Sequence, residues 1–176
     1  LPSDGTLIIN HEIEQSGVIT NGLSCRIITY GFDSSCDYYA DQISFDDYAR
    51  PTFCIHTPDG LSREMTLGLT GRHNISNALT VVALADVLSL SYNRISSALA
   101  SFHGTERRFE YKGTKNGITI IDDYAHHPTE ITATLSTAKN YPHKTTWCVF
   151  QPHTYTRTKA FLQDFAKSLC LADKVI

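Results

Sequence analysis

The sequence lacks an excess of basic residues and any long apolar run. Lys and Arg number 15 against 18 Asp and Glu, which gives a formal net charge of -3 and a pI near 6.2, so nucleic acid is not an expected partner. No apolar run approaches the roughly 20 residues of a membrane span, and no basic-then-apolar signal segment opens the sequence. The composition is that of a soluble globular protein, and we expect a cytoplasmic location.

Motifs for several kinds of chemistry are also missing. The five cysteines are odd in number and widely spread, without a Cys-x-x-Cys pair, so they indicate neither a disulfide framework nor a zinc knuckle. No serine stands in a Gly-x-Ser-x-Gly elbow, which argues against a nucleophilic triad. No Gly-x-x-x-x-Gly-Lys-Ser/Thr loop is present to hold nucleotide phosphates.

Both ends of the sequence are typical of a fragment. Residues 1–5 lead at once into a strand-like run, and residues 175–176 resemble the start of another buried strand. We therefore expect the sequence to belong to a longer protein.

The first 103 residues predict strands followed by helices. Beyond Gly71 the apolar residues recur at helical spacing, which predicts a helix over 74–88 and a second one from Ser91 to before His103. Pro58-Asp59-Gly60 is typical of a tight hairpin turn. The expected strands are 6–10, 26–32, 37–45, 52–57 and 64–67, with a short helical turn at 11–17.

A polar, glycine-bearing segment, residues 104–108, is the expected hinge between domain 1–103 and domain 109–176. Beyond it, strands and helices alternate, as in a parallel sheet with right-handed crossovers. The second domain is thus expected to be a truncated, doubly wound α/β domain. Its predicted elements are strands 109–112, 117–121, 145–151 and 175–176, helices 128–140 and 156–171, and a turn at 113–116.

The densest polar stretch follows strand 117–121 and precedes a helix that begins at Pro128. Ligands of open α/β sheets bind beyond the carboxyl ends of strands, near helix N-termini whose free N–H groups favour anions. A well-capped turn with two solvated histidines is the alternative, but capping needs one side chain rather than five. The five are Asp122, Asp123, Tyr124, His126 and His127.

Two other polar clusters offer donors to a ligand. Asn74 and Asn77 lie on one helical face and can present amides to a base or ribose, although an Asn at a helix start is more often only a cap. Arg107 and Arg108 can clamp a phosphate, although adjacent arginines are usually a solvated linker.

A fourth cluster, residues 151–157, follows the next strand of the second domain. Loops after parallel strands lie at one edge of the sheet, so Asp123, His126, His153 and Arg157 are expected to converge on one crevice. The alternative is an ordinary first helical turn with its cap.

The adjacent histidines do not predict a metal site. Neighbouring residues in a turn point in different directions, unlike His-x-x-x-His on one helix face, so we expect no protein ligands for a metal here. Because neither a metal site nor a nucleophilic triad is predicted, the remaining expectation is recognition of a phosphorylated and carboxylated ligand. The expected chemistry is transfer or ligation rather than hydrolysis.

Four motifs, in order, resemble the Mur ligases of peptidoglycan synthesis, and within that family the alanine-adding member. The similarity covers residue 71 to the C-terminus, whereas the first seventy residues resemble the family loosely, chiefly through Thr29-Tyr30-Gly31-Phe32. The four motifs are Gly71-Arg72-His73-Asn74 with Asn77, the segment 104–109 ending Arg-Arg-Phe, residues 122–131, and residues 150–158.

The resemblance implies a cytoplasmic three-domain enzyme that uses ATP and Mg²⁺. It would phosphorylate the carboxylate of UDP-N-acetylmuramate, and the amine of L-alanine would attack the acyl phosphate. The sequence would supply the second half of the central ATPase domain and part of a Rossmann-like C-terminal domain. The phosphate loop and the Mg²⁺ ligands would lie upstream, so these residues alone are not expected to catalyse, and a homodimer is left open.

The resemblance also implies roles for individual residues. Thr154 stands where many relatives have Arg, so one positive contact is missing. The nucleotide-binding residues would be His73, Asn74, Asn77, Arg108, Asp123 and Tyr124; the substrate-binding residues His126, His127, His153 and Arg157; and the catalytic residues His126 and Arg157.

Two alternatives stay open. A recycling ligase that attaches a whole tripeptide to the same muramate shares these motifs, and the continuation Thr129-Glu130-Ile131 favours the alanine-adding member only modestly. A non-catalytic nucleotide-binding module belongs to a different class. The presence of a phosphate loop upstream would argue against that module.

Overall fold

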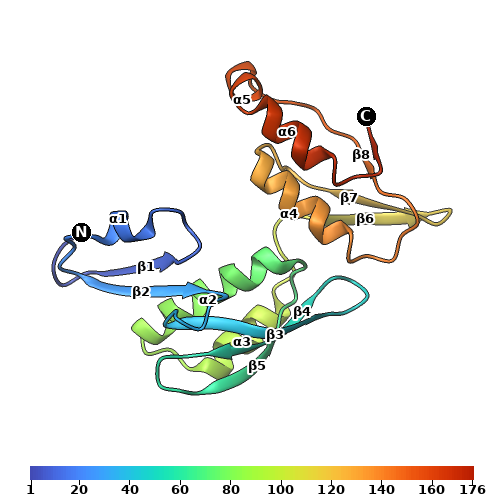
Figure 1. Cartoon of the computed structure of the whole chain (residues 1–176). Coiled ribbons are helices and arrows are strands. Elements are labelled where there is room, and N and C mark those ends of the chain that lie inside the picture. Colours follow the sequence, from blue (N-terminus) through green and yellow to red (C-terminus); the bar gives the residue numbers. More distant parts are fainter. The chain divides into compact units, whose positions relative to one another are not determined.

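The computed structural model describes all residues from Leu1 to Ile176, which fold as two compact units (Figure 1). Unit 1 comprises Leu1–Ser44 and Pro51–Phe102, and unit 2 comprises Phe45–Arg50 and His103–Ile176. The assignment of the loop Phe45–Arg50 to unit 2 has no signal in the sequence.

Unit 1 is built on a five-stranded sheet with strands in the order β1-β2-β3-β4-β5. The pairs β1–β2 and β2–β3 are parallel, and β4–β5 is an antiparallel hairpin in which Phe53 stands opposite Met65. All five predicted strands are present. Their bounds are β1 Thr6–Asn10, β2 Arg26–Gly31, β3 Tyr38–Phe45, β4 Pro51–His56 and β5 Ser62–Thr66, and a short helix α1, Ser16–Thr20, follows β1.

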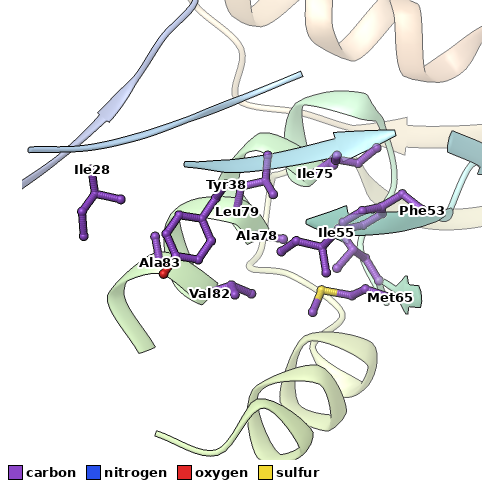
Figure 2. Packing of buried hydrophobic residues seen from close by; sticks show 12 residues of the cluster. Ile28, Tyr38, Phe53, Ile55, Met65, Ile75, Ala78, Leu79, Val82 and Ala83 are labelled. Atoms are coloured by element: carbon purple, nitrogen blue, oxygen red, sulfur yellow. The ribbon is translucent and has the colours of Figure 1, made fainter. Parts of the chain in front are cut away.

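Helix α2, Arg72–Val87, supplies the other half of the core of unit 1 (Figure 2). Its buried residues, among them Ile75, Leu79 and Val82, pack with strand residues such as Phe53 and Ile55. Full burial of such side chains contributes about 1.5–3 kcal/mol each. Helix α3, Tyr92–Ser101, packs its partly buried residues against the same cluster.

Unit 2 contains a hairpin and a parallel strand pair that do not share a sheet. Strands β6, Glu110–Lys115, and β7, Ile118–Asp122, are antiparallel, whereas β8, Trp147–Cys148, and β9, Lys174–Val175, are parallel. The buried core is small: Ile131 and Leu135 of α4, Pro128–Ala138, contact Phe165 of α6, Leu162–Leu169.

Three local predictions for unit 2 differ from the structure, and the first is the strand expected over 145–151, of which only Trp147–Cys148 is a strand. The hairpin turn lies at Asn116-Gly117 rather than at 113–116, because both residues adopt positive φ, 52° and 77°, as a two-residue turn of type I′ requires. The helix expected over 156–171 is broken into α5, Tyr155–Ala160, and α6, with the break at Phe161 (φ -113°, ψ 24°).

None of the helices combines the length with the apolar composition that a membrane-spanning helix requires.

Candidate functional site

The polar stretch of unit 2 forms the connection between the end of β7 at Asp122 and the start of α4 at Pro128. His127 is the N-cap of α4, and its Nδ1 accepts a hydrogen bond from the Thr129 N–H at 3.3 Å. Pro128 occupies the first turn, where its missing N–H has no cost. The ring of His127 also lies edge-on to Phe161, with 5.0 Å between centroids.

Asp123 ties three segments of unit 2 together. Its Oδ1 accepts from the Ala125 N–H at 2.8 Å, and its Oδ2 accepts from the Phe109 N–H at 2.9 Å and from the Thr134 hydroxyl at 3.0 Å. Hydrogen bonds to a carboxylate are about twice as strong as neutral ones. Asp123 therefore ties Phe109, the β7–α4 loop and α4 together.

Glu130 is not among the site residues predicted above, but it contacts two of them, His126 and Arg108. Its carboxylate accepts from the His126 N–H at 2.9 Å, lies 3.5 Å from His126 Nδ1, and lies 3.6 Å from Arg108 Nη1. Partial burial raises the pKa of Glu130, but the His126 N–H and the charges of His126 and Arg108 outweigh it, so the net pKa is lowered.

A sequence signal for Glu130 exists. It stands three residues after the N-cap His127, where a Glu side chain commonly reaches back to free N–H groups of the preceding turn. That pattern indicates a cap, but not that the same carboxylate also binds Arg108.

His126 and Arg157 are brought together, although they are 31 positions apart. Arg157, on α5, donates from Nη1 to the backbone oxygen of His126 at 3.3 Å. Thr154, at the N-cap position of α5, has φ 67° and donates its hydroxyl to the His153 carbonyl at 2.6 Å. The side chain of His153 is exposed.

Aromatic contacts arrange the remaining residues. The guanidinium of Arg107 lies 4.6 Å from the centroid of the Tyr124 ring, and that ring lies 5.1 Å from the ring of His126. His126 Nδ1 also lies 2.9 Å from the Tyr124 backbone oxygen. Tyr124 is half-exposed, so its ring offers a stacking surface flanked by a cation.

Unit 1 contains the other predicted group, at the N-terminus of α2. Asn74 donates its amide to the Thr70 carbonyl at 2.8 Å, and Asn77 donates to Asn74 Oδ1 at 3.0 Å. His73 is exposed on the same turn. Gly71, the cap residue, has φ 89°, a conformation that side chains with a Cβ rarely adopt.

A cavity of about 1120 Å³ lies in unit 2 and is mostly apolar. Residues of β7, α4 and β8 line it, including Ile121, Leu135 and Cys148. Among the predicted site residues only Asp123 reaches its wall. The other predicted side chains of unit 2 do not line this cavity.

The fold and these loops define an α/β protein whose polar side chains gather where helices begin. Two family descriptions match the chain: "Mur ligase middle domain" over residues 1–85 and "Mur ligase, glutamate ligase domain" over residues 107–176. The chain belongs to the Mur ligase family and contains parts of these two domains.

Named relatives agree with this assignment. A UDP-N-acetylmuramate--L-alanine ligase of Agathobacter rectalis is 51% identical over 172 residues, which cover 98% of this chain and 38% of that protein. The chain thus spans well under half the length of this relative.

Solved structures agree in fold. The crystal structure of UDP-N-acetylmuramate-alanine ligase MurC from Thermotoga maritima has a TM-score of 0.74 and 32% identity, over 96% of this chain and 36% of that one. A murein peptide ligase from Psychrobacter arcticus has a TM-score of 0.70 and 30% identity, over 99% and 37%.

Proposed function

We propose that the protein acts in peptidoglycan precursor synthesis as an ATP-dependent ligase that joins L-alanine to the carboxylate of UDP-N-acetylmuramate. The single observation that carries the proposal is the 51% identity, over almost the whole chain, to a relative named for that reaction. The reaction forms an amide bond between two soluble molecules, so we also propose a cytoplasmic location.

ATP would supply the γ-phosphoryl group that converts the muramate carboxylate into an acyl phosphate. The carboxylate oxygen would attack the γ-phosphorus with ADP as the leaving group; the neutral amine of alanine would then attack the carbonyl carbon and lose a proton as inorganic phosphate leaves. Both steps build negative charge on oxygen, which fixed cations and N–H donors stabilise.

The N-terminus of α2 fits the base end of a nucleotide. An amide side chain has one acceptor and two donor hydrogens, and Asn77 uses one hydrogen for Asn74, which leaves it able to bond a base in both directions. Asn74 is held in place by Thr70. We assign His73, Asn74 and Asn77 to the adenine.

Residues of unit 2 are suited to bind the phosphates of the nucleotide and the reacting groups of the substrates. The side chain of Arg108 is 57% exposed although it lies near Glu130, so its guanidinium is accessible to a phosphate. Asp123 and Tyr124 would contact the ribose or phosphate region. His126, His127, His153 and Arg157 would hold the muramoyl group, the acyl phosphate or the amine, with Arg157 positioned by the His126 carbonyl.

The magnesium ion has no carboxylate cluster among these loops. Asp123 uses both oxygens for protein donors, and Glu130 is shared between His126 and Arg108. The Mg²⁺ ligands would therefore come from other parts of the full-length protein.

The test is ADP release by the full-length protein with ATP, Mg²⁺ and UDP-N-acetylmuramate. We expect release to depend on L-alanine, and Arg157→Ala to lower kcat at least a hundredfold. Lys159→Ala, which removes a cation from the same helix, is the control and should leave kcat within twofold.

A murein peptide ligase is the second candidate, favoured by the likeness to the P. arcticus structure. Faster ADP release with the tripeptide than with L-alanine would establish it. No release with either acceptor, despite ATP binding, would indicate a nucleotide-binding module instead.

A further inference from the structure

Three side chains with metal-binding groups of different chemistry converge in unit 1, and none of them belongs to the loops discussed above. Asp41 belongs to β3, and Cys54 and His56 belong to β4. A carboxylate oxygen, the Cys54 Sγ and a ring nitrogen of His56 all lie within 4.8 Å of one another. Thiolate, imidazole and carboxylate together are a donor set that suits zinc.

Strand alternation explains why the three side chains meet. Phe53 and Ile55 are buried in the core with α2, so Cys54 and His56 point to the opposite face of β4. On β3, Ala40 is buried and the adjacent Asp41 points the other way. All three side chains therefore share the face of the sheet that lies opposite the core.

His56 is held in one orientation by three contacts. Its Nε2 lies 2.8 Å from Asp41 Oδ1, its Nδ1 lies 2.8 Å from the Ser62 hydroxyl, and its ring stacks on Tyr39 with centroids 4.2 Å apart. In metal sites the second ring nitrogen usually bonds a polar group that fixes the ring in this way. Ser62 plays that part here, and Nε2 faces Asp41.

A fourth oxygen ligand is within reach. Glu64 of β5 is the register partner of Cys54 in the β4–β5 hairpin, and its side chain is exposed. Directly opposed residues of an antiparallel pair have Cβ atoms about 4.5–5.5 Å apart, so rotation of the Glu64 side chain can bring its carboxylate to the cluster.

We propose that Asp41, Cys54 and His56 bind a zinc ion, with Glu64 as the fourth ligand. The ion replaces the His56–Asp41 hydrogen bond by two coordination bonds and joins β3, β4 and β5 across their outer face. The role of the ion is to stabilise the sheet, and the proposed site does not depend on the ligase reaction.

Cobalt(II) is the probe, because a thiolate ligand gives it a near-ultraviolet charge-transfer band and a tetrahedral site gives it intense visible bands. In titrations of the reduced, metal-free protein we expect one equivalent to bind, and zinc to displace it. Cys54→Ser should abolish the charge-transfer band, and His56→Gln should weaken cobalt affinity at least tenfold.

Cys170→Ser is the matched control, because Cys170 is an exposed thiol of unit 2, and it should leave both the spectrum and the affinity unchanged. Zinc should also raise the unfolding temperature of the unmodified protein but not that of Cys54→Ser. The proposal is overturned if no saturable binding occurs, or if Cys54→Ser keeps the same band. Should Cys54→Ser not fold, Asp41→Asn is titrated instead, and unchanged affinity in that variant overturns the proposal equally.

Discussion

Asp123 combines a proposed ligand contact with a structural task, and the two can be separated by experiment. Its carboxylate accepts three hydrogen bonds, two of them from the backbone N–H groups of Phe109 and Ala125. Removing the carboxylate leaves these donors unsatisfied, which costs up to about 1–3 kcal/mol for each group and less where water reaches the donor.

We therefore predict that Asp123→Ala lowers the free energy of unfolding by about 2–4 kcal/mol in urea denaturation. The adjacent Asp122→Ala is the control. Asp122 lies 3.8 Å from Arg107 Nε, and exposed pairs of this kind contribute about 0–1 kcal/mol. Equal losses for the two variants would contradict the structural role assigned to Asp123.

Glu130 predicts a pH dependence of stability. Its folded pKa lies below the ordinary value, so its contribution is fully present above about pH 4.5 and is lost as the pH falls through the folded pKa. The stability difference between the unmodified protein and Glu130→Gln should thus be larger at pH 7 than at pH 3.

Unfolding in urea at both pH values measures this difference. Glu14→Gln, an exposed carboxylate in unit 1, provides the baseline and should show a difference near zero at both. A Glu130→Gln difference that stays constant with pH would rule out the assigned ion pairs.

Helix α2 is the element on which unit 1 depends most. Leu79 is fully buried in the core, whereas Leu84 of the same helix is 47% exposed. We predict that Leu79→Ala lowers the free energy of unfolding by about 2–5 kcal/mol, and that Leu84→Ala changes it by about 0.5 kcal/mol or less. Similar values for both variants in chemical denaturation would refute this packing.

Among the helices and strands, those with a clear pattern of apolar residues could be predicted from the sequence. The strand Thr6–Asn10 is predictable because it holds a short continuous apolar run, and helix α2 because its apolar residues recur at the period of 3.6 that burial on one face imposes. The turn at Asn116-Gly117 is predicted too early in the sequence because Gly113 is also a typical turn residue. In the structure, Gly113 lies within β6, beside an irregularity in the register.

At the site, sequence reasoning identified side chains but not the partners that hold them. His126 and Arg157 were both named, yet their contact runs through a backbone carbonyl, which carries no residue-specific signal. The Asp41, Cys54 and His56 cluster was missed for a related reason: its members come from two strands, and only the pairing of those strands brings them together.

The whole molecule contains two separate cores of very different size. Unit 1 buries a large cluster around Phe53, Ile55 and Leu79, whereas unit 2 buries chiefly Ile131, Leu135 and Phe165. Small cores support little stability. Unit 2 is therefore expected to unfold at the lower temperature.

Calorimetry should resolve this as two transitions. Phe165→Ala should lower the temperature of the first transition only, because it removes about 3–5 kcal/mol of stability from unit 2. Leu79→Ala should lower the temperature of the second transition only. Leu162→Ala, on the exposed side of α6, is the control for unit 2. A single transition shifted by both core variants would show that the units unfold together.

The separation of β6–β7 and β8–β9 into two sheets has a consequence for self-association. Each strand pairs on one side only, and the large exposed side chains Ile120, Trp147 and Val149 lie on or beside these strands. Unprotected strand edges of this kind recruit strands from neighbouring molecules, which is the first step of aggregation. The unpaired edges of β7 and β8 are thus sites at which copies of the protein can associate.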